Sequence, residues 1–543
     1  MPPAAPNNVA ANLHHYINGF SAGAREIIEY FNFDDHIERM DDPKADILFQ
    51  VVKRFAEIDL SHMGSMEMGY VFEELIRRFA EQSNETAGEH FTPREVIRLM
   101  VNLLFNADRD ILTQKGIVKT LYDPACGTGG MLSVGEMHLC DKEKGLNPDA
   151  KLEVFGQEIN PESYAICKSD MLIKGQNPAN IKFGNTFTAD GLENEKFDYM
   201  LSNPPFGVDW KKAQKVIKDE RANKGFAGRF GAGLPRINDG SLLFLQHMIS
   251  KMKAASPLAP SKGGNGSRIG IVFNGSPLFT GQAGSGESEI RKWIIENDWL
   301  EAIIALPDQL FYNTGISTYI WIVTNKKSPE RKGKIQLINA TGAKDEELIK
   351  EGKRDFNRFW EKMTRSLGNK RKYIPEDGEE KGIKFITKLY GDFEENAFSK
   401  IFPNKFFGYW RVTVEQAKLT EDERLKIKDE TWRIENGQLI MDNGQVKKLK
   451  ADTSLRDYES IPFLRKDENG KLVEQTIEEY FEREVKPHLP DAWIDHGKTK
   501  TGYEINFTKY FYEFKPLRSL EEIRADILAL EEETLELEKK VLE

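Results

Sequence analysis

Between residues 118 and 323, short apolar segments rich in β-branched residues alternate with amphipathic segments, and this alternation restricts the fold more than any other feature of the 543-residue chain. The apolar segments have the length of strands and lie at residues 118–122, 152–157, 197–202, 268–273, 300–305 and 316–323. Helical periodicity occurs between most of them, notably at residues 161–172, 241–252 and 287–296. This alternation predicts an α/β fold with a mostly parallel, doubly wound sheet.

The sequences on either side of this region have a different character. Upstream, residues 45–52 and 71–79 repeat apolar side chains at helical spacing, so we expect an N-terminal helical domain over residues 1–87. The α/β domain is then expected over residues 88–330. Residues 331–515 are rich in charge and weakly periodic, and we expect this region to pack on the α/β domain.

The last segment, residues 516–543, carries a regular apolar pattern. Seven residues follow one another at alternating spacings of three and four: Leu520, Ile523, Ile527, Leu530, Thr534, Leu537 and Val541. Such a seam, flanked by Glu and Lys, is the a/d pattern of a heptad repeat and predicts a helix. A helix of this length is marginal by itself, so it either binds a partner helix or covers the protein's own core.

Composition excludes several classes of protein. The chain is 39% hydrophobic and 30% charged, which is typical of soluble globular domains, and it contains no apolar run of membrane-spanning length. Its first residues, Met1 to Pro6, lack the basic and apolar regions of a signal peptide. The three cysteines lie far apart and form neither a metal motif nor a disulfide framework. We therefore expect a cytoplasmic protein with no metal site and no membrane partner.

A glycine-rich loop, DPACGTGG from Asp123 to Gly130, directly follows the first expected strand and opens a helix. Glycines allow a tight turn and a close approach to a ligand, and the helix start offers free N–H groups. Position 132 is Leu, so the dinucleotide fingerprint is incomplete, and the chain has no nucleotide-binding P-loop. Asp123 would repel a pyrophosphate but suits a ligand with a cationic ammonium group, such as S-adenosylmethionine. A turn without a ligand is the alternative.

Glu158 stands at the end of the second expected strand. In open α/β sheets, ligands bind beyond the carboxyl ends of the strands, where an acid can accept hydrogen bonds from both hydroxyls of a ribose. A single Glu at such a place is otherwise a solvated loop residue. Its position one strand and helix after the glycine loop favours a role in binding.

A third motif, Asn203-Pro204-Pro205-Phe206, directly follows the third expected strand. An amino group on an aromatic ring is a poor nucleophile because its lone pair is delocalised. The Asn203 side-chain oxygen and the Pro204 carbonyl could accept its two N–H bonds and turn the lone pair towards a methyl donor, and the consecutive prolines fix the direction of that carbonyl. Phe206 offers a face on which an extruded base could stack. Otherwise the motif is a turn with an exposed Phe.

In this order, the three motifs resemble those of the amino-group DNA methyltransferases of the gamma arrangement, in which the cofactor half precedes the catalytic half. Residues 88–95 (GEHFTPRE) resemble the segment that crosses the cofactor site of these enzymes. More narrowly, residues 225–247, 305–316 and 511–518 resemble parts of the modification subunit of type I restriction-modification systems. The resemblance is close over residues 45–325.

This resemblance implies a Rossmann-like, S-adenosylmethionine-dependent methyltransferase sheet over residues 88–330, acting on N6 of a flipped adenine. Cofactor contacts are expected, from the resemblance and from the loop argument above, at Glu89, His90, Phe91, Thr92, Pro93, Arg94, Asp123, Thr128, Gly129, Gly130 and Glu158. Catalytic roles are expected for Asn203, Pro204, Pro205 and Phe206. At Asn185 many relatives have Asp, but Asn can still accept a hydrogen bond from the cofactor's adenine amino group. Phe311 or Tyr312 would either stack on the flipped base or pack in the core.

The resemblance also implies partners, namely double-stranded DNA, a specificity subunit, a restriction subunit and a second copy of the chain. The net charge of −11 is unusual for a protein that holds DNA alone, because binding phosphates requires a basic surface. Delegating recognition to the specificity subunit would resolve this. The segment 211–236 could contact DNA or be a solvated basic loop, since it has two acids and eight basic residues: Lys211, Lys212, Lys215, Lys218, Arg221, Lys224, Arg229 and Arg236.

Several alternatives share parts of this pattern. A protein glutamine methyltransferase uses the same Asn-Pro-Pro logic but usually has Tyr in place of Phe206 and is much shorter. An RNA amino-group methyltransferase is not excluded by the catalytic motif, and an inactive assembly protein would not need the intact motifs. Cytosine C5 chemistry is disfavoured because the chain has no Pro-Cys nucleophile. A fused nuclease would have to use residues 379–381 (EEK), which read as a surface loop.

Overall fold

The computed structural model describes residues 8–42, 44–59, 62–63, 68, 71, 75, 92–255, 266–312, 314–342, 357–376, 378–429, 431–512 and 519–542. The chain divides into two compact units, Met1–Ile505 and Asn506–Glu543.

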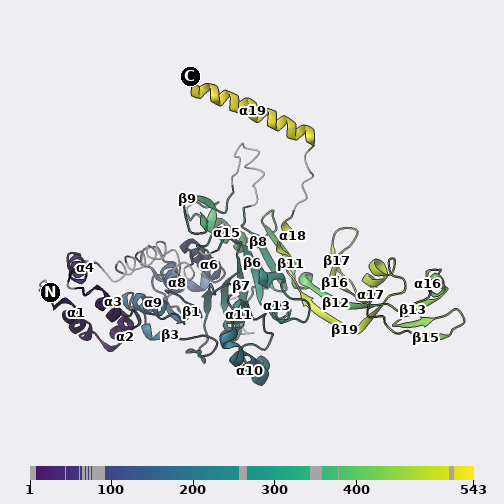
Figure 1. Ribbon diagram of the computed structural model, residues 1–543, viewed down its shortest axis with the longest axis horizontal. Helices are drawn as coiled ribbons and strands as arrows, with labels where there is room; N and C mark the ends of the chain where they lie inside the picture. Colours follow the sequence, from purple (N-terminus) through teal and green to yellow (C-terminus); the bar gives the residue numbers. More distant parts are fainter. Residues whose placement is uncertain are drawn as a thin grey trace. The chain divides into compact units, whose positions relative to one another are not determined.

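Strands of the first unit form a central sheet in the order β11-β8-β6-β7-β5-β4-β1-β2-β3 (Figure 1). Its strands are β1 (Val118–Asp123), β2 (Lys151–Glu158), β3 (Ile181–Phe183), β4 (Tyr199–Ser202), β5 (Arg268–Phe273), β6 (Leu300–Ala305), β7 (Tyr319–Thr324), β8 (Lys334–Asn339) and β11 (Ser399–Pro403). The pairings within β3-β2-β1-β4-β5 are parallel, whereas β7 runs antiparallel between β5 and β6. The six expected strands all belong to this sheet, and the predicted α/β class is confirmed.

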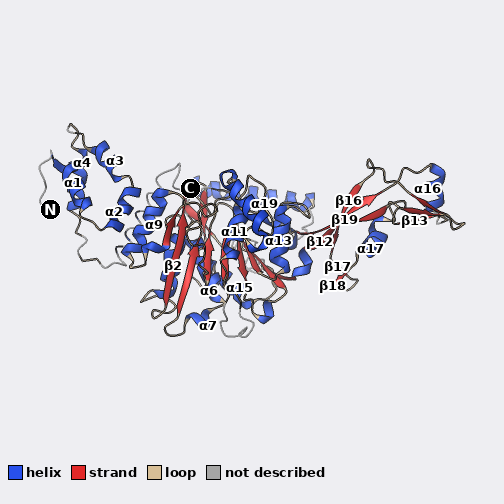
Figure 2. Cartoon of the chain, turned by 90° about the horizontal axis from the view of Figure 1, so that it is seen from below, coloured by secondary structure: helices blue, strands red, loops and turns tan. Residues whose placement is uncertain are grey.

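Helices cover both faces of the sheet (Figure 2). Neighbouring residues of β1 show this, because successive side chains of a strand point to opposite faces. Leu121 belongs to the core that also contains side chains of α6 (Arg94–Asn106), α8 (Gly130–Cys140), α9 (Pro161–Ile173) and α15 (Gly382–Asp392). The Tyr122 hydroxyl lies 3.0 Å from His247 Nε2 of α11 (Ser241–Ser250), which contacts α13 (Gly286–Glu296).

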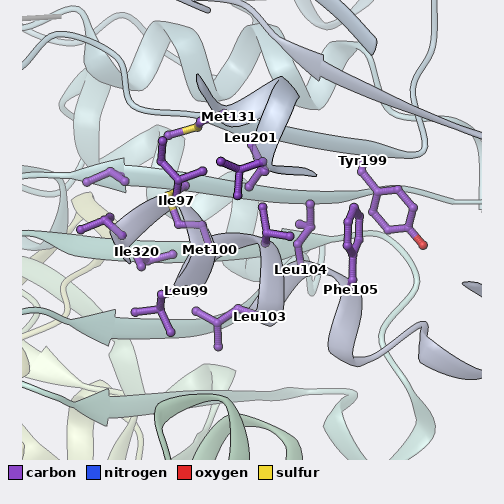
Figure 3. Close-up of a cluster of buried hydrophobic side chains, with 14 of the residues drawn as sticks. Ile97, Leu99, Met100, Leu103, Leu104, Phe105, Met131, Tyr199, Leu201 and Ile320 are labelled. Atoms are coloured by element: carbon purple, nitrogen blue, oxygen red, sulfur yellow. The ribbon is translucent and has the colours of Figure 1, made fainter. Parts of the chain in front are cut away.

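Helix α6 forms much of this core, although the sequence prediction did not include it. Ile97, Met100 and Leu104 pack towards β4, where Leu201 lies among them (Figure 3). Phe105 packs edge-to-face on Tyr199 with the ring centroids 4.9 Å apart. The sequence carries a signal for α6, because its polar residues, among them Arg94, Arg98 and Asn102, fall on one face of the helix and most of its apolar residues fall on the other.

The N-terminal region is helical where it is described, with α1 (Val9–Asn18), α2 (Ala22–Tyr30), α3 (Phe33–Met40) and α4 (Ile47–Ala56). Val9, Ile37 and Leu48 form a small core of their own. Helix α2 packs on α9, where Glu26 pairs with Lys168 at 2.8 Å. Most of the expected helix at residues 71–79 lies outside the described residues.

The charge-rich region after residue 330 contains more strands than its sequence suggested. In addition to β8 and β11, it forms the hairpin β9 (Glu361–Leu367) and β10 (Lys370–Tyr373) and a sheet of order β16-β12-β19. The remaining elements there are β12 (Gly408–Glu415), β13 (Arg433–Glu435), β14 (Gln438–Ile440), β15 (Val446–Lys448), β16 (Asp457–Pro462), β17 (Leu464–Lys466), β18 (Leu472–Glu474), β19 (Trp493–Tyr503), α16 (Glu421–Lys428) and α17 (Ile477–Tyr480). Several of these strands expose most of their residues, which explains the weak apolar pattern.

The shorter helices of the first unit are α7 (Arg109–Leu112), α10 (Gln214–Lys224) and α12 (Ser276–Phe279). The second unit contains α18 (Phe507–Phe511) and the long helix α19 (Leu520–Leu542). The predicted heptad segment is therefore helical, and its apolar residues Leu520, Ile527, Leu530 and Leu537 are exposed. None of the described helices combines the length and the apolar character needed to cross a membrane.

Candidate active site

The parallel strands β1, β2 and β4 end at the same edge of the sheet, and a cavity of about 120 Å³ lies there. The cavity is lined by residues at or just after the ends of these strands and of β3, together with one residue of α11: Pro124, Ala125, Gly127, Gln157, Glu158, Ile159, Gly184, Asn185, Thr186, Phe187, Asn203, Pro205 and Phe244. Parallel packing therefore brings together the three motifs that the sequence analysis singled out. This is the place where ligands of open α/β sheets bind.

The glycine loop after β1 needs its glycines for conformation and for space. Gly127 and Gly129 have φ angles of 53° and 86°, in the left-handed region that other residues rarely adopt. A Cβ atom on Gly129 would lie 2.8 Å from Cys167 Sγ of α9. The loop thus turns directly into α8 while packing tightly against the neighbouring helix.

Glu158 is held as a fixed carboxylate on the wall of the cavity. Its Oε2 accepts a hydrogen bond from the Gly127 N–H at 2.8 Å, and its Oε1 accepts from the N–H groups of Ile159 and Asn160 at 2.9 and 2.7 Å. A carboxylate offers about four acceptor positions, so these three bonds leave capacity for a ligand hydroxyl. Glu158 thus lines the cavity, and its contact with a ribose stays a prediction.

Asp123 is buried beneath the site and is not among the residues that line the cavity. Its Oδ1 accepts hydrogen bonds from the Ala125 N–H at 3.0 Å and from Ser202 Oγ at 2.9 Å. Burial raises the pKa of Asp123 to about 7, although these two hydrogen bonds act in the opposite direction. The bond to Ser202 ties the end of β1 to the residue that immediately precedes Asn203.

Asn203 is oriented by a residue far away in the sequence. Its Nδ2 donates a hydrogen bond to Thr92 Oγ1 at 2.9 Å. Its Oδ1 is buried and has no hydrogen-bond partner among the described residues. Because a buried acceptor without a partner costs about 1–3 kcal/mol, such an atom requires an explanation. Here the unpartnered oxygen belongs to a side chain that lines the cavity, so it can receive an N–H from a bound molecule.

The other expected catalytic residues surround Asn203. Pro204 is buried, Pro205 lines the cavity, and Phe206 is half-buried against the main core. Phe311 is 1% exposed within that core, so its ring packs there and is not free to stack on a base in this conformation. Tyr312 is half-buried, with Lys370 Nζ 4.8 Å from the centre of its ring.

Only some of the remaining residues that the sequence suggested as cofactor contacts lie at the cavity. Glu89, His90 and Phe91 lie outside the described residues. Thr92 contacts Asn203, while Pro93 and Arg94 form the start of α6. Thr128, Gly129 and Gly130 lead into α8 but do not line the cavity. Asn185 lines it, and its Oδ1 accepts hydrogen bonds from the N–H groups of Phe187 and Thr188 at 2.8 and 3.3 Å.

Some residues of the cavity were not found by sequence reasoning. Ile159 and Phe187 add apolar surface to its wall, and Gln157 and Thr186 brace the surrounding loops. The sequence did contain a signal for Ile159, which directly follows Glu158, and for Phe187, which follows Asn185 by two residues. The place of Phe244 in α11 had no comparable signal.

The basic segment 211–236, which follows the motif Asn203–Phe206, contains both internally paired and exposed side chains. Arg229 is bound internally, since it pairs with Glu220 at 2.6 Å and donates to the carbonyl oxygens of Thr186 and Phe187 at 2.8 Å each. The side chains on and before α10 are exposed: Lys211, Lys212, Lys215, Lys218, Arg221 and Lys224. The exposed positive charges therefore lie on α10 and on the residues just before it, beside the loop that lines the cavity.

With the antiparallel strand β7 inserted between β5 and β6 and the cavity over the ends of β1, β2 and β4, the protein falls into the Rossmann-like α/β class of the S-adenosylmethionine-dependent methyltransferases. Residues 65–375 match the family described as N-6 DNA Methylase, and the chain belongs to this family. The family expected from the motifs is thereby confirmed.

Individual relatives agree with this assignment. The chain is 29% identical over 292 residues to the MjaIX methylase subunit of a type I restriction enzyme from Methanocaldococcus jannaschii, over 53% of this chain and 47% of that one. It is 30% identical over 281 residues to the HindI methylase subunit from Haemophilus influenzae, over 51% of this chain and 55% of that one. The chain thus spans about half the length of the curated relatives it matches.

Among solved structures, the chain is similar to a type I restriction-modification system methyltransferase subunit from Streptococcus thermophilus. The two superpose with a TM-score of 0.54 over 73% of each chain, at 22% sequence identity. At this identity the similarity demonstrates a shared fold.

Proposed function

We propose that this protein transfers a methyl group from S-adenosylmethionine to N6 of adenine in DNA, as the modification subunit of a type I restriction-modification complex. The observation that carries this proposal is the buried, unpartnered Oδ1 of Asn203, held at the cavity by the hydrogen bond to Thr92. An acceptor in this position suits a substrate amino group, which has N–H bonds to donate.

The residues around the cavity fit the cofactor. The fixed carboxylate of Glu158 has acceptor capacity for the hydroxyls of a ribose, and Ile159 and Phe187 supply apolar surface for a purine ring. Asn185 Oδ1 already accepts two backbone hydrogen bonds, so it would take the adenine amino group only as a further donor. When bound, S-adenosylmethionine supplies a methyl group on a positively charged sulfur.

The chemistry of the protein itself consists of orienting the nucleophile. Asn203 Oδ1 and the Pro204 carbonyl accept the two N–H bonds of the target amino group, which moves its lone pair out of conjugation with the ring. Phe206 supplies a face for the base after it leaves the duplex, and Pro205 stiffens the turn. The burial of Asn203 Oδ1 strengthens these bonds because little water competes for it.

The assembly follows from the same proposal. The exposed lysines and arginines on and before α10 contact the phosphates around the extruded adenine. The N-terminal helical domain helps to close around the DNA, and residues 331–515 support the methyltransferase domain. The seam of α19 packs on helices of the specificity subunit, which reads the sequence, and the complex includes a second copy of this chain and a restriction subunit.

The test is transfer of labelled methyl from S-adenosylmethionine to duplex DNA, with nucleoside analysis of the product. It is run with the full chain alone and with its specificity subunit, with Asn203→Ala as the control that removes the acceptor. We expect N6-methyladenine that depends on Asn203 and on the partner. Label that appears on RNA or protein, and not on DNA, would refute the proposed substrate.

A further inference from the structure

The hairpin β9–β10 is a basic element that the proposed function does not yet use. Residues 361–373 contain five basic residues and one acidic residue, in a chain whose net charge is −11. The sequence pattern predicts no role for this segment beyond its place in the charge-rich region after residue 330.

The five basic residues of the hairpin form two groups, of which the first is paired with other residues of the protein. Lys370 is 4% exposed and pairs with Glu95 at 2.6 Å, while Lys372 pairs with Asp308 and lies 4.1 Å from the centre of the Trp360 ring. These two lysines hold the hairpin on the protein.

The other three basic residues, Lys362, Arg365 and Arg371, are exposed. None of them forms an ion pair within the part of the chain that the structure describes. Pairing among the described residues therefore does not explain why this surface hairpin carries them.

The anchors place the hairpin close to the catalytic amide. Glu95, which pairs with Lys370, is in the first turn of α6, three residues after the Thr92 that bonds to Asn203. On its other side, the Asn369 N–H donates to the Tyr312 carbonyl at 3.0 Å. That carbonyl belongs to the loop after β6, and β6 runs in the same direction as β4 and β5, so this loop leaves the sheet at the edge where Asn203 lies.

The hairpin is also rigidly mounted. Phe359, two residues before β9, and Ile374, one residue after β10, are both 1% exposed in the main core. The backbone N–H groups of Arg371 and Lys372 donate to the Gln309 carbonyl at 2.8 and 3.1 Å. Basic side chains on such a support lose less conformational freedom on binding than those of a loose loop.

We propose that Lys362, Arg365 and Arg371 bind the phosphate backbone of the DNA next to the extruded adenine. The hairpin and the basic residues on and before α10 then contact the duplex from two separate elements of the fold. This inference rests on the proposed function for the identity of the nucleic acid. Phosphate contacts fix the position of a protein on DNA without reading its sequence, which suits a subunit that delegates recognition.

The test compares two triple variants of the full chain. Lys362→Gln with Arg365→Gln and Arg371→Gln removes the three exposed charges of the hairpin. The matched control, Lys428→Gln with Lys448→Gln and Lys450→Gln, removes three exposed charges on and near α16 and β15, which pack on a separate small core. Binding to a fluorescent duplex is measured by anisotropy over a series of salt concentrations, alone and with the specificity subunit.

Each phosphate contact contributes about 0.9 to the slope of log affinity against log salt. We expect the hairpin variant to lose about 2 to 3 from this slope, with an unchanged unfolding midpoint and unchanged S-adenosylmethionine affinity. The control variant should keep the wild-type slope.

An unchanged slope in the hairpin variant, or no DNA binding by the wild type either alone or with the specificity subunit, would overturn the inference. Weaker subunit assembly with an unchanged slope would assign the surface to an acidic protein instead. A lower slope without any N6-methyladenine from the wild type would refute the proposed reaction and leave the hairpin as a DNA contact.

Discussion

At the scale of single residues, the site depends on one hydrogen bond between Thr92 and Asn203, which are 111 residues apart. An amide can rotate so that either its oxygen or its nitrogen faces the cavity. By accepting from Nδ2, the Thr92 hydroxyl leaves Oδ1 without a partner in a side chain that lines the cavity. Thr92, which the sequence suggested as a cofactor contact, instead holds in this structure the amide that we propose to be catalytic.

The substitution Thr92→Val keeps the shape of the side chain but removes the acceptor. A hydrogen bond of this kind contributes about 0.5–1.5 kcal/mol, so we expect kcat for methyl transfer to fall by up to about tenfold. The KM for DNA and the Kd for S-adenosylmethionine should stay near the wild-type values, and Thr92→Ser should restore most of kcat. Equal losses for Val and Ser, or a weaker Kd for the cofactor with unchanged kcat, would instead favour a direct cofactor contact.

At the scale of elements, the glycine turn between β1 and α8 is limited by its neighbour α9. Sequence reasoning recognised the turn because glycines after a strand have a local meaning. It could not identify Cys167 as the side chain that fills the space beside Gly129, since that contact joins positions 38 residues apart in the chain. Helix α6, in contrast, carries a one-sided pattern that the sequence does reveal, because its polar residues Arg94, Arg98 and Asn102 repeat at helical spacing on one face.

Replacing Gly129 with Ala should therefore destabilise the protein in two ways. The left-handed backbone costs roughly 1–2 kcal/mol for any residue with a Cβ, and the contact with Cys167 adds about 1–3 kcal/mol of overpacking. Gly116→Ala is the matched control, because Gly116 has a φ of 70° and a Cβ atom there would have nothing within 4 Å. Urea unfolding of both variants separates the two costs, and equal losses would rule out the packing contribution.

At the scale of the whole molecule, the chain combines a methyltransferase sheet with segments that we propose to serve assembly. Helix α19 forms in the second compact unit and exposes Leu520, Ile527, Leu530 and Leu537 of its heptad pattern, as we expect of a surface that binds a partner. The first unit meanwhile extends the sheet beyond β6 through β8 and β11, from a region whose sequence pattern did not predict them.

Point substitutions on α19 test the role of the seam. Ile527→Glu with Leu530→Glu places charge on the seam, whereas Leu528→Glu with Leu535→Glu places it on similarly exposed positions beside the seam. We expect the first pair to weaken assembly with the specificity subunit by at least about tenfold, measured by light scattering, and the second pair to have little effect. Indistinguishable complexes from the two variants would exclude the seam as the interface.

The sequence by itself determined the α/β class, the position of the six predicted strands and the three motifs after them, because strand periodicity and the chemistry of Gly, Pro and Asn are local properties. Only the tertiary structure decided which side chains complete the site. The bond from Thr92 to Asn203, the backbone donors on Glu158 and the anchoring of the β9–β10 hairpin on α6 all join distant parts of the chain. Such contacts depend on how the elements pack, and no local pattern of residues encodes them.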